Sequence, residues 1–274
     1  MAMRLALKFG YDGRKFHGFV RQPGQRTVEC DIMDALQNLR ILAPFASPRT
    51  IRYGAASRTD AGVSAIGNAI AFDTSFRRDA LLPALNARLE DIWFHSTAAV
   101  LDGFWPRQAQ MRWYRYHLST NEIGDLDALR LALRLFTGRH DFSNFCRAEG
   151  RSAIRTIRKL RVRKSGPFIT VDLFSQGFLW NMVRRIMGAA LAVSCGELRQ
   201  AEVRRALDEP GRKADLGLAP PEPLILMDVA YEGVDFVRDG KAIELARRRL
   251  ERKRSEAIGT QLLASYLLPT GKSP

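Results

Sequence analysis

One aspartate of this chain has neighbours that suit it for acid-base or nucleophilic chemistry. Asp60 lies in the segment Ser57-Arg58-Thr59-Asp60-Ala61-Gly62-Val63-Ser64-Ala65, between two runs that both resemble strands. A guanidinium close to a carboxylate lowers its pKa, so Arg58 is expected to keep Asp60 ionised. Gly62 permits a positive φ after the acid, which would turn the carboxylate toward a cleft. An isolated Arg-Thr-Asp triplet is more often a turn cap, so other features must decide.

A second group of residues that could do chemistry is the predicted strand Arg112-Trp113-Tyr114-Arg115-Tyr116. Strand alternation puts Trp113 and Arg115 on one face and Tyr114 and Tyr116 on the other. Two aromatic rings on one face are usually core residues. Aromatic residues interleaved with arginines also suit an RNA surface, where rings stack on unpaired bases and guanidinium groups hold phosphates.

A predicted helix from Phe178 supplies a third candidate. Arg184 lies on its polar stripe with Asn181 and Gly188. Such an arginine can extend along the apolar surface to solvent, or it can point into a cleft between domains and pair with an acid. The buried stripe is expected to contain Leu179, Val183, Ile186 and Ala190.

Basic residues dominate two stretches. The segment from Arg147 to Lys164 contains one acid, Glu149, among eight basic residues, and its expected partner is a phosphate backbone. From Lys241 to Leu268 the chain predicts a basic helix, Glu244 through Arg254, followed by a less regular apolar tail. That helix is either a solvated face or a lid or RNA contact.

The composition narrows the classes of partner. A net charge of +14 and a pI of about 10.3 indicate a polyanionic partner, most commonly nucleic acid. The longest apolar run, Ile186 to Cys195, is too short to cross a bilayer, and the N-terminus has no hydrophobic signal core, so a cytoplasmic protein without membrane association is expected. Three separated cysteines and four scattered histidines predict neither a disulfide framework nor a metal site.

The order of predicted elements indicates an α+β fold made of two ferredoxin-like units. Strand, helix, two strands, helix and strand is the order of such a unit, and it leaves one sheet face uncovered. The expected domains are residues 1–104 and 105–274, with the boundary between Val100 and Gln110. The first unit is predicted from strands 4–11, 50–56, 66–73 and 92–99 with helices 27–42 and 79–89, and the second from strands 113–119, 154–163, 168–174 and 225–231 with helices 126–136, 178–193 and 202–207.

Taken together, these motifs resemble the TruA-type tRNA pseudouridine synthases over nearly the whole chain. Ser57 and Ser64 stand where bacterial members usually have Gly and His, a pattern similar to archaeal and eukaryotic members. The motifs that carry the resemblance are Tyr11-Asp12-Gly13 to Gln22, Arg58 to Val63, Arg112 to Tyr116, Gly138 to Phe145, Phe178 to Gly188, and Leu218 to Pro221.

The resemblance implies a pseudouridine synthase fold, with two ferredoxin-like subdomains of mostly antiparallel sheet around a central cleft. It also implies that Asp60 is the catalytic acid, that Arg58 opens or holds the target nucleotide, that Tyr114 stacks on the uracil, and that Arg184 pairs with Asp60. Asp60 could attack the sugar, attack the base, or assist elimination. The candidate RNA-binding residues are Arg21, Arg112, Arg147, Arg151, Arg155, Arg158 and Lys159.

The implied activity is isomerisation of uridine to pseudouridine in the anticodon stem-loop of tRNA, at positions 38, 39 and 40, without a metal or cofactor. The implied assembly is a twofold-symmetric homodimer. Since Asp60 belongs to the first unit and Tyr114 and Arg184 to the second, the site is expected between two sheets that meet edge to edge or face to face. The alternative is a catalytically inactive RNA-binding protein, a chaperone of tRNA folding, on the same scaffold.

Overall fold

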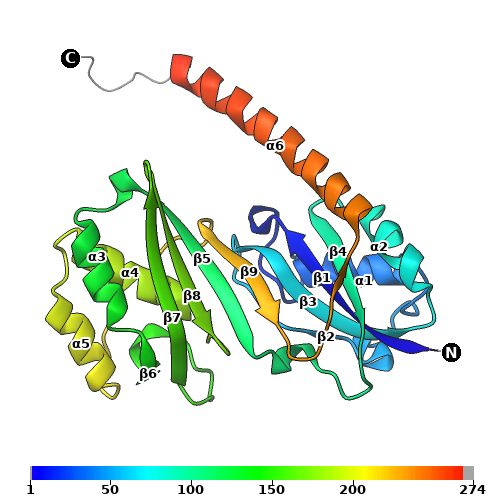
Figure 1. Ribbon diagram of the computed structural model, residues 1–274, viewed down its shortest axis with the longest axis horizontal. Helices are drawn as coiled ribbons and strands as arrows, with labels where there is room; N and C mark the ends of the chain where they lie inside the picture. Colours follow the sequence, from blue (N-terminus) through cyan, green and yellow to red (C-terminus); the bar gives the residue numbers. More distant parts are fainter. Residues whose placement is uncertain (1, 268–274) are drawn as a thin grey trace.

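A single sheet runs through the whole molecule. The computed structural model describes residues 2–267, and within them ten strands are hydrogen-bonded in the order β10-β4-β1-β3-β9-β5-β8-β7-β6, with β2 beside β3 (Figure 1). All pairs are antiparallel except β3 with β9. The fold is therefore α+β, as expected.

The first half has the ferredoxin-like order β4-β1-β3-β2. Thr27 caps the first helix as predicted, because its Oγ1 accepts a hydrogen bond from the Cys30 amide at 3.3 Å. The elements are β1 (Met3–Tyr11), α1 (Val28–Asn38), β2 (Gly54–Ala55), β3 (Ser64–Thr74), α2 (Arg78–Asn86) and β4 (Ile92–Ala99).

The strand predicted over residues 50–56 is largely wrong. Pro48–Ile51 forms a 3-10 turn capped by Ser47, and Arg52 takes a left-handed conformation with φ of 46°. Neither conformation can continue a strand, so only the two residues of β2 pair with β3. Most of the residues whose apolar and polar types alternate there belong to a loop and not to a strand.

The second half repeats the same order as β9-β5-β8-β7, with β6 added at its outer edge. The alternation predicted for the strand after Arg112 is correct: Tyr114 and Tyr116 are buried, whereas Trp113 and Arg115 contact Asp172 on the opposite face. The elements are β5 (Met111–Ser119), α3 (Leu126–Arg134), β6 (Gly138–Asp141), β7 (Ile154–Ser165), β8 (Phe168–Ser175), α4 (Met182–Ser194), α5 (Gln200–Asp208) and β9 (Leu224–Ala230).

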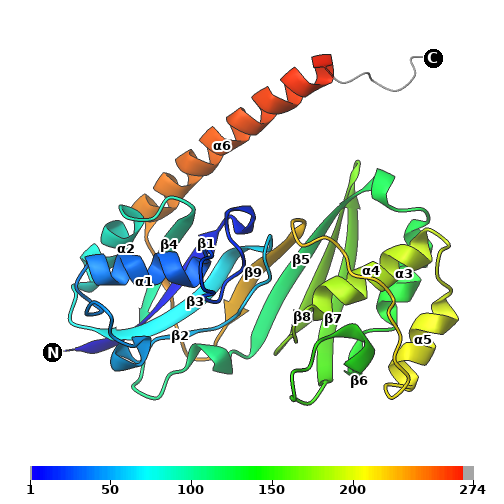
Figure 2. The same ribbon diagram turned by 180° about the vertical axis from the view of Figure 1, so that it is seen from behind.

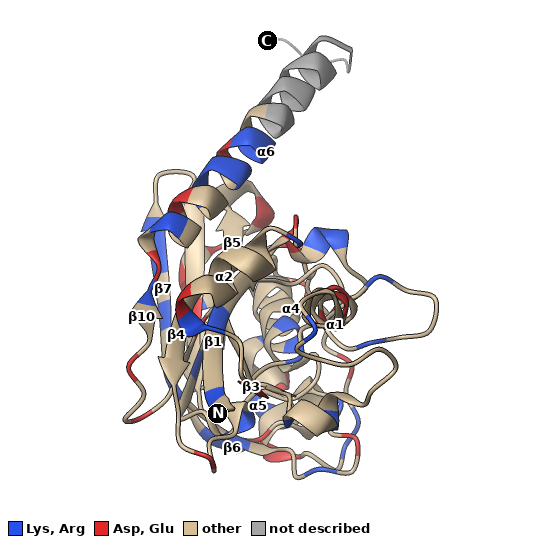
Figure 3. Ribbon diagram, turned by 90° about the vertical axis from the view of Figure 1, so that its right-hand side faces the viewer, with Lys and Arg blue, Asp and Glu red and all other residues tan. Residues whose placement is uncertain are grey.

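The five helices α1 to α5 lie on one face of the sheet and leave the other face uncovered (Figures 2 and 3). The two halves meet edge to edge, because β3 pairs in parallel with β9 through Ser64 opposite Ile225 and Ala65 opposite Leu226. This junction lies directly after the segment that contains Asp60. The two halves consequently share one sheet at the candidate site.

The end of the chain returns to the first half. Strand β10 (Val237–Arg238) pairs with β4, and α6 (Gly240–Leu267) packs against β4 and α2 before it extends away from the body (Figure 1). The expected irregular tail after Arg254 is wrong as far as Leu267, since the helix continues; Leu268 lies outside the described residues. The division into domains 1–104 and 105–274 stays a prediction, although α6 contacts the first half.

Candidate active site

The loop around Asp60 is held by buried polar contacts. The Tyr11 hydroxyl lies 2.8 Å from Thr59 Oγ1, and the Phe19 amide donates to the Thr59 carbonyl at 3.0 Å. Asn68, which is fully buried, donates to the Ser57 carbonyl at 3.0 Å and accepts from the Ser57 amide at 3.3 Å. These contacts fix both residues that flank Arg58 and thereby limit the positions that Asp60 can take.

Gly62 takes the positive φ that the sequence predicts, with a value of 84°. A Cβ built on it would lie 2.8 Å from Cγ of Pro221, in the segment that precedes β9. Both the backbone conformation and this close approach require glycine. Gly62 therefore lets the Asp60 loop touch the second half.

Helix α4 brings the partner of Asp60. Arg184 Nη1 lies 3.2 Å from Asp60 Oδ2, with the two side chains 14% and 19% exposed. The Arg184 Nε donates to the Ala219 carbonyl at 2.8 Å, which orients the guanidinium. Asn181 begins the helix from a left-handed conformation, which explains why α4 starts at Met182 and not at Phe178. The ion pair expected from the resemblance is present.

The pKa of Asp60 is raised above its ordinary value, mainly because the carboxyl is buried. The hydrogen bond and charge of Arg184, with a hydrogen bond from Trp180, oppose this effect without overcoming it. The net pKa shift is therefore upward, not downward as expected, and the guanidinium that opposes it belongs to Arg184 and not to Arg58. Arg58 is exposed and forms no salt bridge with Asp60 in the described part of the chain.

Tyr114 is 8% exposed and lines the cavity that contains Asp60. Its ring meets that of Phe178 edge to face, with centroids 5.2 Å apart. Burial raises the pKa of Tyr114 to about 12, so the phenol stays neutral near pH 7. It can offer an aromatic surface and a hydroxyl to a base inserted beside Asp60.

The cavity has a volume of about 1480 Å³ and draws its lining from both halves. Burial lowers the pKa of Arg107, and the charges of Arg58 and Arg151 lower it further. Arginines crowded in this way favour a polyanion, because an anion relieves their mutual repulsion. The arginines that line the cavity are Arg58, Arg107, Arg112, Arg139, Arg151, Arg155, Arg158 and Arg184, and the acids are Asp60 and Glu149.

The structure brings together some of the candidate RNA-binding residues and separates others. Arg112, Arg151, Arg155 and Arg158 line the cavity. Arg147 lies outside the lining, with its guanidinium 4.8 Å from the ring centroid of Trp180.

Arg21 and Lys159 also lie outside the cavity lining. Arg21 pairs with Glu29 at 3.6 Å, and Lys159 is exposed on β7, opposite Phe174 of β8. The RNA-binding roles stay predictions, but Arg112 also has a structural role, because its buried guanidinium donates to Ser57 Oγ at 3.1 Å and to the Ala56 carbonyl at 2.9 Å.

Sequence reasoning missed several contributors to the cavity, among them Arg107, Arg139 and Trp180. Trp180 reaches Asp60 and is 42% exposed, which is unusual for tryptophan and suits a contact surface. The position of Trp180, one residue before Asn181 at the start of the helix that carries Arg184, could have indicated its contact with the site. Arg139 belongs to the Gly138 to Phe145 motif and also lines the cavity.

No metal site is evident among the described residues, because no three His, Cys, Asp or Glu side chains cluster suitably. In the same part of the chain, no helix is both long and apolar enough to cross a membrane.

Comparisons with known proteins identify the family of this chain. A family model described as tRNA pseudouridine synthase matches residues 132–232. The tRNA pseudouridine synthase A of Thermococcus kodakarensis is 43% identical over 271 residues, covering 97% of this chain and 99% of that protein. The protein of the same name from Pyrococcus abyssi is 39% identical over 269 residues, covering 97% of each.

Among solved structures, a chain in the crystal structure of the archaeal box H/ACA sRNP Nop10-Cbf5 complex is a distant match. It has 12% sequence identity and a TM-score of 0.34, covering 66% of this chain and 45% of that one.

The sequence relatives define the class of this protein, which is an isomerase that acts on uridine in tRNA. Within that class, the chain belongs to the tRNA pseudouridine synthase family, as the identity over nearly its full length shows.

Proposed function

We propose that this chain converts uridine to pseudouridine in the anticodon stem-loop of tRNA, with Asp60 as its catalytic carboxylate. The observation that carries the proposal is the ion pair between Asp60 and Arg184, 3.2 Å apart in a cavity lined by arginines. The pair joins the two halves of the molecule at the cavity.

The isomerisation breaks the bond from ribose C1′ to uracil N1 and forms a bond from C1′ to C5. The proton leaves C5, and N1 carries a proton in the product, so the atoms balance without any redox change. An ionised carboxylate can act as nucleophile or assist this cleavage. Arg184 favours the ionised form of Asp60 against the effect of burial.

The target base must leave its stack to reach a carboxylate that is only 19% exposed. Tyr114 and Trp180 offer rings to the extruded base, while Arg58 and Arg107 can hold the flanking phosphates. In this proposal Arg58, which is exposed, holds the nucleotide open, as the family resemblance implies.

Tritium release from tRNA labelled at uracil C5 tests the assignment of Asp60. Asp60→Asn should abolish release and leave tRNA affinity within a few-fold, because the amide keeps the shape but is not a nucleophile. Comparable turnover by Asp60→Asn would refute the catalytic role. If the wild-type protein binds tRNA but releases no tritium, the inactive RNA-binding alternative holds instead.

The choice of the anticodon stem-loop, with tRNA positions 38, 39 and 40, rests on the family resemblance. Chemical mapping of pseudouridine in a tRNA transcript treated with the wild-type protein is the test. Modification confined to that stem-loop is expected. Modification elsewhere in the tRNA would contradict the proposed target and leave Asp60 as the catalytic group.

We also propose a twofold-symmetric homodimer. The sheet face opposite α1 to α5 is uncovered (Figure 1) and carries Trp113, whose ring stacks on that of Phe174 with centroids 5.5 Å apart. A second copy could cover such a face through an isologous contact. Light scattering at micromolar concentration should give twice the chain mass; a monomer mass with full activity would refute this proposal.

A further inference from the structure

Helix α6 and the end of α2 enclose a second concavity, which we call the α6 groove. Its volume is about 490 Å³, and its lining shares no residue with the cavity around Asp60. One wall is the turn after α2 and the other is the first part of α6. The lining consists of Ala87, Arg88, Leu89, Glu90, Leu245, Arg248, Arg249 and Arg252.

The α6 groove contains four arginines and one acid, Glu90. Arg249 is already used within the protein, because it donates to the Leu89 carbonyl at 2.7 Å and to the Asn86 carbonyl at 3.1 Å. The other three arginines are exposed. Among the described residues, Arg88 and Arg252 form no salt bridge, while Arg248 shares Glu244 with Arg247.

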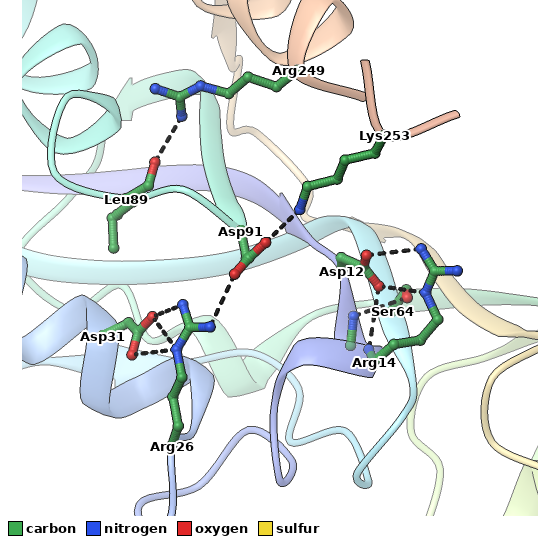
Figure 4. Close-up of polar contacts among 10 residues, drawn as sticks. Asp12, Arg14, Arg26, Asp31, Ser64, Leu89, Asp91, Arg249 and Lys253 are labelled. Atoms are coloured by element: carbon green, nitrogen blue, oxygen red, sulfur yellow. Dashed lines mark hydrogen bonds and ion pairs between the residues drawn. The ribbon is translucent and has the colours of Figure 1, made fainter. Parts of the chain in front are cut away.

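The wall formed by α6 is rigidly attached. Lys253 pairs with Asp91, whose other oxygen accepts from Arg26 at 2.9 Å, and Asp91 is buried (Figure 4). Arg249 and Lys253 are four residues apart, so both lie on the side of α6 that contacts the body. Arg248 and Arg252 are also four residues apart and line the groove next to them. Because the helix backbone is already fixed, binding has to order only the arginine side chains.

The same anchor connects the α6 groove to the catalytic loop. The Asp91 carbonyl accepts from the Asp12 amide at 3.1 Å, and the next amide, that of Gly13, donates to Ser64 Oγ at 3.0 Å. Ser64 begins β3, directly after the Asp60 loop. A ligand in the α6 groove is thus held by the same half of the molecule that contains Asp60.

We propose that the α6 groove binds the phosphate backbone of tRNA outside the target loop. This inference rests on the proposed function, since it takes tRNA as the substrate. Guanidinium groups match the geometry of phosphate oxygens, and three of them on two facing walls suit consecutive phosphates of a folded RNA. The cavity around Asp60 holds the target nucleotide, and the α6 groove holds a more distant part of the same molecule.

The test compares two RNAs, a full-length tRNA transcript and the isolated anticodon stem-loop. For the double variant Arg88→Ala/Arg252→Ala, affinity for full-length tRNA should fall about 10-fold near 0.15 M salt, and the salt slope of binding should decrease by about two. Affinity for the stem-loop and kcat on the full-length tRNA should not change. The matched control is Arg204→Ala/Arg205→Ala, which removes two exposed arginines from α5.

Equal losses on both RNAs, or equal losses in the α5 control, would overturn the proposal, because either result reflects only net charge. Unchanged tRNA binding by the double variant would also overturn it, as expected if the groove receives an acidic protein instead. The affinity for tRNA is measured independently of uridine isomerisation. A wild-type protein that fails to isomerise uridine therefore refutes the proposed function and leaves this binding result to be judged separately.

Discussion

At the scale of single residues, the carboxyl of Asp60 is subject to two opposing influences. Burial raises its pKa, and Arg184 with Trp180 acts in the opposite direction. If Asp60 acts in its ionised form, the enzyme should need a higher pH than it would with an ordinary aspartate at this position. The pH dependence of the enzyme should report this balance directly.

Replacing Arg184 shifts that balance in a known direction. Arg184→Gln removes a charge that favours the ionised form, so the pKa of Asp60 should rise further, and the acid limb of kcat/KM should move to higher pH. Arg185→Gln is the control, because Arg185 lies on the same helix but pairs with Asp215 at 3.1 Å. An acid limb that is identical in both variants would contradict the role of Arg184.

Asp60→Asn should not lower the melting temperature. The folded-state pKa of this acid is raised above its unfolded value, so ionisation at neutral pH works against folding, and a neutral amide removes that effect. Calorimetry at pH 7 is the measurement. A loss of several degrees would mean that the ion pair with Arg184 stabilises the fold despite burial of the acid.

Local patterns in the sequence, a short glycine-marked loop and an arginine on a polar helix stripe, made Asp60 and Arg184 candidates, and the family resemblance implied that the two side chains pair. It did not give the direction of the Asp60 pKa shift. That shift depends on burial, to which the second half of the chain contributes through Pro221 and α4. Local spacing carries no information about such burial.

At the scale of elements, burial separates two arginines that the sequence grouped together as candidate RNA-binding residues. Both line the cavity, but Arg112 is buried and donates to Ser57 and Ala56, whereas Arg155 is half-exposed. Arg155→Ala should reduce the salt slope of tRNA binding by about one unit. Arg112→Lys should lower the melting temperature and kcat and leave that slope unchanged. Equal salt slopes for both variants would contradict this distinction.

The contact between α6 and the body should depend on pH. Burial alone would raise the pKa of Asp91, but hydrogen bonds from Lys253 and Arg26 hold it below its ordinary value. Its contribution to stability is therefore present above the unfolded-state pKa and is lost as pH falls through the folded-state pKa.

Asp91→Asn should weaken this contact by about 2 kcal/mol at neutral pH. Hydrogen exchange of the α6 amides near Lys253 should become faster, while exchange in β1 and β3 stays slow. Uniform acceleration through the whole protein would show instead that Asp91 supports global stability.

Element order was predictable, because each helix and most strands carry their own periodic pattern. The prediction of a strand over residues 50–56 was wrong, because alternation of apolar and polar residues over seven positions does not distinguish a strand from a capped turn followed by a left-handed residue. The continuation of α6 to Leu267 was also missed. The contacts that anchor the first part of α6 are polar ones through Arg249 and Lys253, so no strong apolar stripe marks this helix in the sequence.

At the scale of the whole molecule, the sequence predicted two units whose sheets meet. In the structure they meet where two residues of β3 pair in parallel with two residues of β9. No local pattern predicts that pairing, since the strands are far apart in the sequence. The return of β10 and α6 to the first half was unforeseen for the same reason.

The pairing of β3 with β9 has a consequence for how the protein is made. A ribosome releases the segment with Asp60 early, but Arg184 and β9 emerge only after most of the chain has been synthesised. Contacts between such distant segments form late and slowly. The two sides of the cavity around Asp60 therefore come together only when nearly the whole chain has been synthesised.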